Sequence, residues 1–358
     1  MKNKISGLLS ILRIVLVFLI HLNYFGTRLV FIKNYGEILE LFIICSLVLI
    51  VLIKLLKYKY GAKKVLLFLL LTAFSIVSYL VTKNSLIPVS ILFLISANNR
   101  RMEDIVREDL IAKIACFAIL ALLNFMNFID SGVFLRDTSI RESFGFVHPN
   151  TAGYMAMSMF ADILVISSCK KSILVIAAAT SLIALLADSR TSLMIIIALL
   201  ITRLIIANKI SSRQQKTRKR LVLLLPLMVL ALSIFSTYRF IEGDMLARNI
   251  NTALSGRLTW QSVYYQNEKI SMFGNNMDYK GRPLDNAYYR IIYSNGIIGL
   301  IFFISILTIS LKRAYERKDM TLSVLMLLTI YSLSEWLIFR IPTSPLLTLP
   351  VTKGKELK

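Results

Sequence analysis

Side chains that commonly carry enzymatic chemistry are scarce in this sequence. Only two of its 358 residues are histidine and three are cysteine, and 20 acidic residues face 42 lysines and arginines. It contains no Gly-rich phosphate loop following a strand, no HExxH motif and no GxSxG motif. These absences exclude a soluble nucleotide enzyme. We also expect no cofactor and no metal, because the polar segments hold no tight group of carboxylates or histidines.

Long apolar runs dominate what is present. Hydrophobic residues make up 56% of the chain and the mean hydropathy is +0.70, above the roughly 45–50% apolar content of soluble domains. We therefore predict an all-α, polytopic membrane protein with about eleven spans, within a range of 10–12. The first apolar run is taken as a span and not as a signal peptide. The expected span centres are Val15, Leu47, Ala73, Ile91, Ala118, Met157, Ala179, Ala198, Met228, Phe302 and Leu328.

The net charge of +22 has a topological explanation. Nucleic-acid binding requires a continuous basic surface, whereas in this chain the basic residues form short clusters between apolar runs. If the N-terminus is cytoplasmic, the inner segments carry roughly twice as many lysines and arginines as the outer ones, in agreement with the positive-inside rule. We therefore predict a cytoplasmic N-terminus, contact with membrane lipids and no nucleic-acid partner.

This topology places three polar segments on the outer face of a single membrane domain, residues 1–358. They are the loop Asp130 to His148, the short turn Asp188 to Thr191, and the long loop Tyr238 to Asp285 between spans 9 and 10. Loops as long as the third are uncommon without a function. Within it, the apolar spacing of Arg257 to Lys269 predicts a short helix in the headgroup region.

Arginine recurs in these outer segments, at Arg141, Arg190 and Arg257. A guanidinium group matches phosphate oxygens with a fixed fork of donors, so together the three would suit a pyrophosphate. The alternative is that each arginine anchors a helix end among lipid headgroups. We expect Arg141 and Arg257 to act in catalysis and Arg190 to bind substrate.

Two residues are candidates for the base that accepts a proton. His148 could accept a proton, because histidine ordinarily titrates near neutrality. It could equally form structural hydrogen bonds before the next helix, which Asn150 or Thr151 can cap. Asp285 closes the long loop and is the preferred candidate, because a partly desolvated carboxylate there would acquire a raised pKa. The remaining expected substrate-binding residues are Ser189, Asn150, Asn286, Tyr288 and Trp260.

Ionisable residues also occur in or near the apolar runs. His21 is expected to be a satisfied polar residue near a span end, with a functional role as the alternative. The others are too scattered along the sequence to predict a proton path, and they are Arg13, Asp162, Arg203 and Glu335.

Several of these motifs together resemble a known family. The segment RESFGFVHPNTAG (141–153) is similar to the R…FGFxHPNxxG segment of Wzy-type capsular and exopolysaccharide polymerases, within the O-antigen polymerase and O-antigen ligase superfamily. The similarity covers roughly Ser131 to Leu300. It extends to the segments DSRTSL (188–193), SGRLTW (255–260), FGNN (273–276) and LDNAYYRIIYSNGIIGL (284–300).

The resemblance implies a glycosyltransferase of the bacterial plasma membrane. Such a polymerase joins undecaprenyl-pyrophosphate-linked oligosaccharide repeat units on the outer face, without metal or nucleotide, alongside a flippase and a chain-length regulator. Ligases of the superfamily usually have histidine at the position of Asp285, so this departure favours a polymerase. The alternatives are a ligase-like transferase and a non-enzymatic polysaccharide or lipid transporter.

Overall fold

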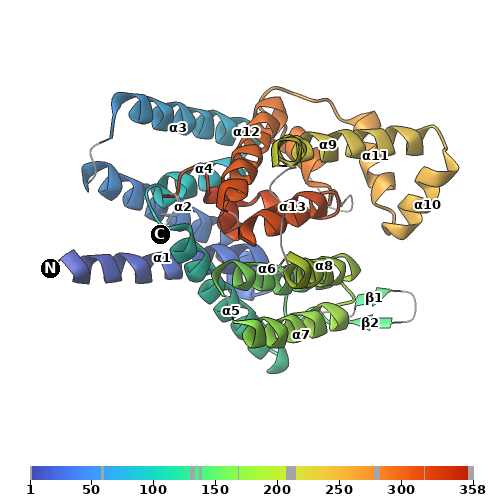
Figure 1. Cartoon of the computed structure of the whole chain (residues 1–358), viewed down its shortest axis with the longest axis horizontal. Coiled ribbons are helices and arrows are strands. Elements are labelled where there is room, and N and C mark those ends of the chain that lie inside the picture. Colours follow the sequence, from blue (N-terminus) through green and yellow to red (C-terminus); the bar gives the residue numbers. More distant parts are fainter. Residues whose placement is uncertain are drawn as a thin grey trace.

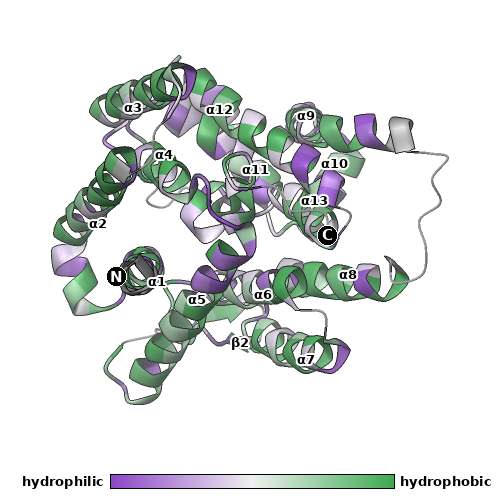
Figure 2. Cartoon of the chain, turned by 60° about the vertical axis from the view of Figure 1, so that its left-hand side comes forward, coloured by the Kyte–Doolittle hydropathy of each residue, from purple (hydrophilic) through white to green (hydrophobic). Residues whose placement is uncertain are grey.

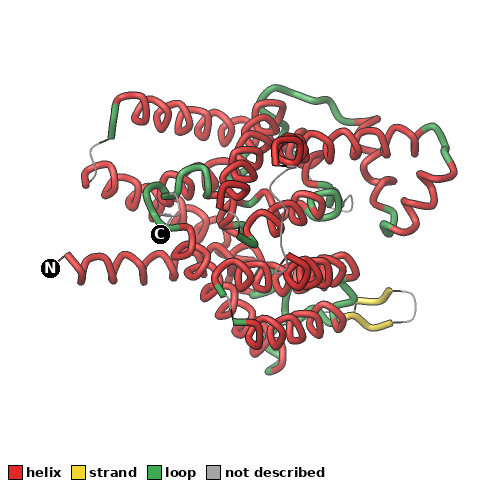
Figure 3. Tube along the Cα trace, viewed as in Figure 1, coloured by secondary structure: helices red, strands yellow, loops and turns green. Residues whose placement is uncertain are grey.

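The computed structural model describes residues 2–57, 60–129, 134–136, 139–167, 169–206, 215–277, 283–317 and 319–353. In this part of the chain there are thirteen α-helices and one two-stranded hairpin (Figure 1). The all-α prediction is confirmed apart from that hairpin, which Figure 3 distinguishes from the helices. Residues 130–133 and 137–138 of the loop Asp130 to His148, residues 278–282 of the long loop and the basic segment 207–214 lie outside the described residues.

The helices of the first half and the hairpin are α1 (Lys2–Phe25), α2 (Val30–Lys57), α3 (Ala62–Thr82), α4 (Leu86–Ala97), α5 (Met102–Phe125), β1 (Phe134–Arg136), β2 (Ser139–Arg141), α6 (Pro149–Ile166) and α7 (Lys170–Leu186). The second half comprises α8 (Arg190–Ile206), α9 (Gln215–Ile241), α10 (Met245–Ala253), α11 (Arg257–Asn267), α12 (Ala287–Arg317), α13 (Thr321–Tyr331) and the 3-10 turns η2 (Trp336–Phe339), η3 (Ile341–Thr343) and η4 (Pro345–Thr348).

Within the described residues, four helices are long and apolar enough to cross a membrane, which indicates a multi-pass membrane protein. These segments are Phe31–Leu56, Ala62–Thr82, Lys219–Ile241 and Ala287–Arg317. All eleven expected span centres fall in separate helices, but eleven spans are not confirmed. The other helices fall short because some are brief, like the 17-residue α7 and α8, and because α5 carries several charged residues.

The bundle has a buried centre and an apolar surface. Every residue of α4 is buried, although α4 is only 12 residues long. By contrast, α3 exposes Leu69 and Leu70 by 62% and 60%. Figure 2 shows hydrophobic residues predominating along α2 and α3. An outer surface this apolar fits a lipid environment, since large exposed apolar patches are rare on soluble proteins.

Helix α12 is broken at Gly296, where the long loop returns to the bundle. Gly296 has φ 73°, and a Cβ added there would lie 2.4 Å from the backbone nitrogen of Gly274. The backbone N–H of Ile297 instead donates to Ser271 O at 3.1 Å, so the loop accepts a hydrogen bond that the helix releases. The segments FGNN and SNGIIG therefore meet backbone to backbone, which requires glycine on both sides.

The long loop between α9 and α12 contains two helices. Helix α11 confirms the short helix predicted for Arg257 to Lys269, and α10 precedes it. Asp244 caps α10 by accepting a hydrogen bond from the backbone N–H of Ala247 at 2.9 Å. In Figure 1, α10 and the β hairpin lie at one end of the molecule, and the N-terminus of α1 lies at the other.

Candidate functional site

Arg141, the last residue of β2, joins two of the sequence motifs, RESFGFVHPNTAG (141–153) and DSRTSL (188–193). Its guanidinium group donates to Asn150 Oδ1 at 2.6 Å and to the backbone oxygens of Ala187 and Asp188 at 3.1 and 3.2 Å. The residue is 6% exposed. Arg141 and Asn150 are thus in contact, and the hydrogen bonds of Arg141 hold the hairpin, the start of α6 and the α7–α8 turn in place. Their roles toward a substrate stay predictions.

The α7–α8 turn packs closely against α6. A Cβ added at Gly153 would lie 2.3 Å from Ser189 Cβ, so only glycine permits this approach. Ser189 is 4% exposed and its hydroxyl donates to Ser192 Oγ, which is 2.8 Å from Tyr331 OH. Ser189 therefore lies inside a helix interface. Arg190 is different, since its side chain is 66% exposed and pairs with Asp188 at 3.3 Å.

His148 occupies the N-cap of α6. Its Nδ1 accepts a hydrogen bond from the backbone N–H of Asn150 at 3.1 Å, and the Phe134 ring stands against it edge-on at 5.3 Å between centroids. An accepting Nδ1 assigns the proton of the neutral imidazole to Nε2. This geometry favours the structural role of His148 over the role of base.

Arg257, in the middle of the long loop, faces Asp285 at the end of that loop. Arg257 begins α11, and its Nε lies 3.4 Å from Asp285 Oδ2. The side chains are 14% and 33% exposed, so Asp285 is accessible while the arginine is partly covered. Two residues predicted from the sequence to be catalytic are thus in direct contact.

Glu335 is a third ionisable residue, close enough to Arg257 and Asp285 for their charges to act on it. It lies between α13 and η2, beyond the candidate spans, and is 6% exposed. Burial, together with the negative charge of Asp285, raises the pKa of Glu335 to about 8. A neutral acid thus accompanies a more exposed carboxylate. Such an unequal pair is typical of sites that move protons.

Asn286 and Tyr288 follow Asp285 but turn into the protein. Asn286 caps α12 by accepting from the backbone N–H groups of Tyr288 and Tyr289, both at 3.1 Å, and it donates to Ser233 Oγ at 2.7 Å. Tyr288 is fully buried against Phe339, with 5.4 Å between ring centroids. Both residues position Asp285 at the helix start. Their predicted contact with substrate remains a prediction, as does that of the partly exposed Trp260 on α11.

Two arginines that the sequence reading did not select lie next to Glu335. Arg290 stacks on the Trp336 ring at 3.6 Å, and Arg340 lies 3.6 Å from the Tyr24 centroid and 4.2 Å from that of Trp336. Within the described residues, Nε and Nη1 of Arg340 are buried without a hydrogen-bond partner. For Arg340 the signal was an arginine four positions after a tryptophan in an otherwise apolar stretch, whereas Arg290 lies 46 positions before Trp336 and gave no such signal.

A second group of charges lies inside the bundle, away from any loop. His21 Nε2 is 2.7 Å from Asp109 Oδ1, and Lys113 bridges Asp109 and Asp162, at 2.6 Å from the latter. The expectation that His21 is a satisfied polar residue near a span end is met only in part. Its Nε2 is paired, but its Nδ1 is buried without a hydrogen-bond partner among the described residues, and His21 and Asp162 belong to one network. The sequence reading missed it because Asp109 is 88 positions from His21. In the described part of the chain no group of residues has the composition of a metal site.

No family model matches the chain, and neither a curated protein nor a solved structure is significantly similar to it.

Proposed function

We propose that this protein is a membrane-embedded glycan polymerase that extends undecaprenyl-pyrophosphate-linked oligosaccharide repeat units into capsular polysaccharide or exopolysaccharide. The observation that carries the proposal is the Arg257–Asp285 pair, at 3.4 Å, beside the buried Glu335. The motif similarity to Wzy-type polymerases supports it independently. The site of action would be the outer face of a bacterial plasma membrane.

In this proposal Asp285 accepts the proton of the acceptor hydroxyl as its oxygen attacks the anomeric carbon of the donor sugar. One carbon–oxygen bond forms to the acceptor and one breaks to the pyrophosphate, which leaves on the lipid as an anion. Arg257 stabilises the charge that develops on the leaving pyrophosphate. The contact with Asp285 engages Nε of Arg257, and the two other guanidinium nitrogens can also donate.

The remaining arginines support this chemistry in different ways. Arg190 is exposed and can reach a phosphate in solution or in the headgroup layer. Arg141 holds the hairpin and the α7–α8 turn through three hydrogen bonds, so in the proposal it positions the outer surface more than it binds substrate. The acceptor base is Asp285, because His148 is used as a helix cap.

A lipid or polysaccharide transporter is the second candidate, and two observations favour it. Helix α12 is interrupted at Gly296, and a charged network of His21, Asp109, Lys113 and Asp162 lies within the bundle. Transporters commonly place polar groups on broken helices near the membrane centre. The charged groups of the network pair with one another, however, and among its ring nitrogens only His21 Nδ1 is left buried without a hydrogen-bond partner in the described part of the chain.

Purified protein with a lipid-linked repeat unit as its substrate distinguishes these functions. A polymerase yields a ladder of products that differ by whole repeat units in mass. A single addition onto a different acceptor would indicate a ligase-like transferase. Movement of the lipid-linked glycan across a reconstituted bilayer, with no new product, would indicate a transporter and overturn the proposal.

A further inference from the structure

A basic cavity lies at the other end of the bundle from Asp285. It has a volume of about 460 Å³ and is formed by α1, the α4–α5 turn, the start of α5 and the C-terminal segment. Its basic lining consists of Arg13, Arg100, Arg101, Arg107 and Lys353. We call it the Arg100 cavity.

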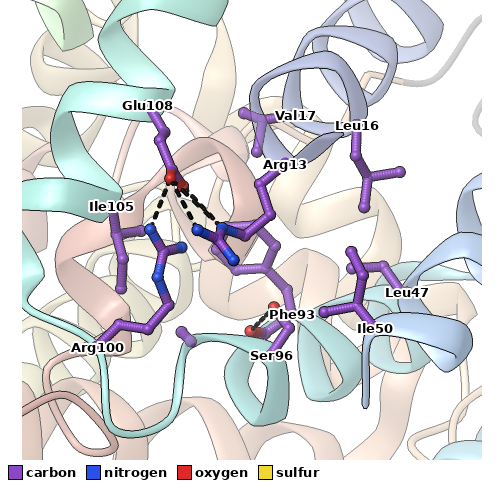
Figure 4. Close-up of a pocket in the computed structure, with 11 residues that line it drawn as sticks. Arg13, Leu16, Val17, Leu47, Ile50, Phe93, Ser96, Arg100, Ile105 and Glu108 are labelled. Carbon is purple, nitrogen blue, oxygen red and sulfur yellow. Dashed lines mark hydrogen bonds and ion pairs between the residues drawn. The ribbon is translucent and has the colours of Figure 1, made fainter. Parts of the chain in front are cut away.

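Positive charge in the Arg100 cavity exceeds negative charge. Five basic side chains meet only two carboxylates, Asp104 and Glu108. Figure 4 shows Arg13 and Arg100 converging on Glu108, whose Oε1 is 2.6 Å from Arg100 Nη2 and 3.4 Å from Arg13 Nη2. One glutamate therefore serves two arginines. The cavity holds an excess of three positive charges, which an anion would compensate.

Three of the basic residues are available to such an anion. Arg101, Arg107 and Lys353 are exposed, and they form no ion pair with any described residue. The backbone N–H of Lys353 donates to Arg100 O at 2.8 Å, which fixes the C-terminal segment beside the cavity. Arg101 is also the N-cap of α5, so its position is fixed at the start of that helix.

On the side formed by α1 and α5, the edge of the cavity is apolar. Ile14 and Ile111 line it, and Ile111 is 46% exposed. Further along the same two helices, Val15 and Ile114 are 47% and 51% exposed. A basic cavity continued by an exposed apolar strip matches a phosphate headgroup with its acyl chains.

We propose that the Arg100 cavity binds the phosphate group of an anionic membrane lipid. Helix α5 has 24 residues, so it separates this cavity from the hairpin end by about 36 Å, more than the roughly 30 Å hydrocarbon thickness of a bilayer. The cavity would thus sit in the leaflet opposite the Arg257–Asp285 pair. This lipid site is independent of the proposed polymerase activity.

The test is native mass spectrometry of the full chain in detergent, titrated separately with phosphatidylglycerol, phosphatidylcholine and inorganic phosphate. The wild type should retain phosphatidylglycerol in preference to phosphatidylcholine. Replacing Arg101 and Arg107 together by alanine should weaken phosphatidylglycerol binding about tenfold or more, since each basic residue near an anionic lipid contributes on the order of 1 kcal/mol. Lys353→Ala alone should weaken it less.

The matched control removes two charges elsewhere. Lys170 and Lys171 are exposed at the start of α7 and do not line the cavity, so K170A together with K171A should bind phosphatidylglycerol like the wild type. Equal loss in the control would reduce the site to general surface charge and overturn the proposal. Equal retention of both lipids by the wild type would also overturn it. Binding of inorganic phosphate but not of phosphatidylglycerol would assign the cavity to a soluble phosphate instead.

Discussion

Two groups of paired acidic and basic residues, the His21–Asp109–Lys113–Asp162 network and the Arg257–Asp285 pair, differ in their exposure to solvent. Inside the bundle, Asp109 and Lys113 are 0% and 1% exposed and pair with His21 and Asp162, while His21 Nδ1 stays buried without a hydrogen-bond partner among the described residues. At the hairpin end, Asp285 also pairs with a basic residue but remains 33% exposed. The inner network is built to hold α1, α5 and α6 together, whereas the outer pair retains access to a ligand.

This comparison shows why the presence of charge in a membrane protein does not by itself locate chemistry. An intramembrane ionisable residue is a functional candidate by default, but the inner residues engage one another at short distance. Removing a partner there leaves a buried charge uncompensated. Removing a partner at Asp285 leaves a carboxylate that water can still reach. Substitutions in the inner network should therefore mainly lower stability, whereas substitutions at Asp285 should mainly lower activity.

The largest expected effect is on stability, at Lys113. Lys113→Met removes the cation shared by Asp109 and Asp162 and should lower the free energy of unfolding by about 3–5 kcal/mol. Arg107→Ala, an exposed change on the same helix, is the control and should alter it by less than about 0.5 kcal/mol. Thermal unfolding in detergent measures both. If Lys113→Met melted with the wild type, the network would not be what holds these helices.

A pH-dependent effect of intermediate size is expected at Glu335. Its pKa is raised from 4.5 to about 8 in the folded protein, so between these values the folded state holds a proton that the unfolded chain has lost. The free energy of unfolding therefore falls as pH rises through this window. Glu335→Gln removes the titration, so its stability relative to wild type should increase by roughly 2–4 kcal/mol from pH 5 to pH 8. Parallel melting curves for the two proteins over this range would refute the assignment.

Changing each of the two predicted catalytic arginines to lysine should have different effects. Arg141→Lys loses hydrogen bonds to Ala187 and Asp188 and should cost about 1–3 kcal/mol of stability. Arg257→Lys has one contact to lose, at 3.4 Å, and should leave stability nearly unchanged while turnover falls about tenfold or more. Melting temperature and chain growth per folded molecule are the measurements. The reverse pattern would make Arg257 the structural residue and Arg141 the one that acts on substrate.

The smallest expected effect is at the α6 cap. His148→Ala should cost about 1 kcal/mol of stability, and His148→Asn, which can also cap a helix, should cost less. Both variants should retain chain growth when it is normalised to folded protein. Abolished growth in both, with unchanged stability, would return His148 to the role of base.

Local sequence patterns predicted the helices, but they could not predict contacts between distant segments. Apolar runs predicted helices at all eleven expected centres, and the spacing after Arg257 predicted α11. Sequence patterns could not locate the hairpin, which depends on an antiparallel register such as Leu135 with Ile140. They also could not reveal the break at Gly296, because a glycine in a long apolar run is compatible with an unbroken helix.

The candidate functional site was likewise predictable from local motifs but not from long-range contacts. The motif arginines were found, but the partners that distinguish Arg141 from Arg257 come from segments far away in sequence, such as the α7–α8 turn 47 positions after Arg141. Glu335 was seen only as one ionisable residue near a span end. Its proximity to Asp285 depends on how α12 and α13 pack, which no local spacing encodes.

The most direct test of the central comparison is the rate of chain growth by purified Asp285→Asn and Asp162→Asn, each normalised to folded protein and to bound lipid-linked donor. Asp285→Asn should bind donor and extend it about 10²-fold more slowly than the wild type, because the amide cannot accept a proton. Asp162→Asn should lower the amount of folded protein while each folded molecule keeps its rate. Undiminished growth by Asp285→Asn, with loss confined to Asp162→Asn, would place the chemistry in the inner network and contradict the account.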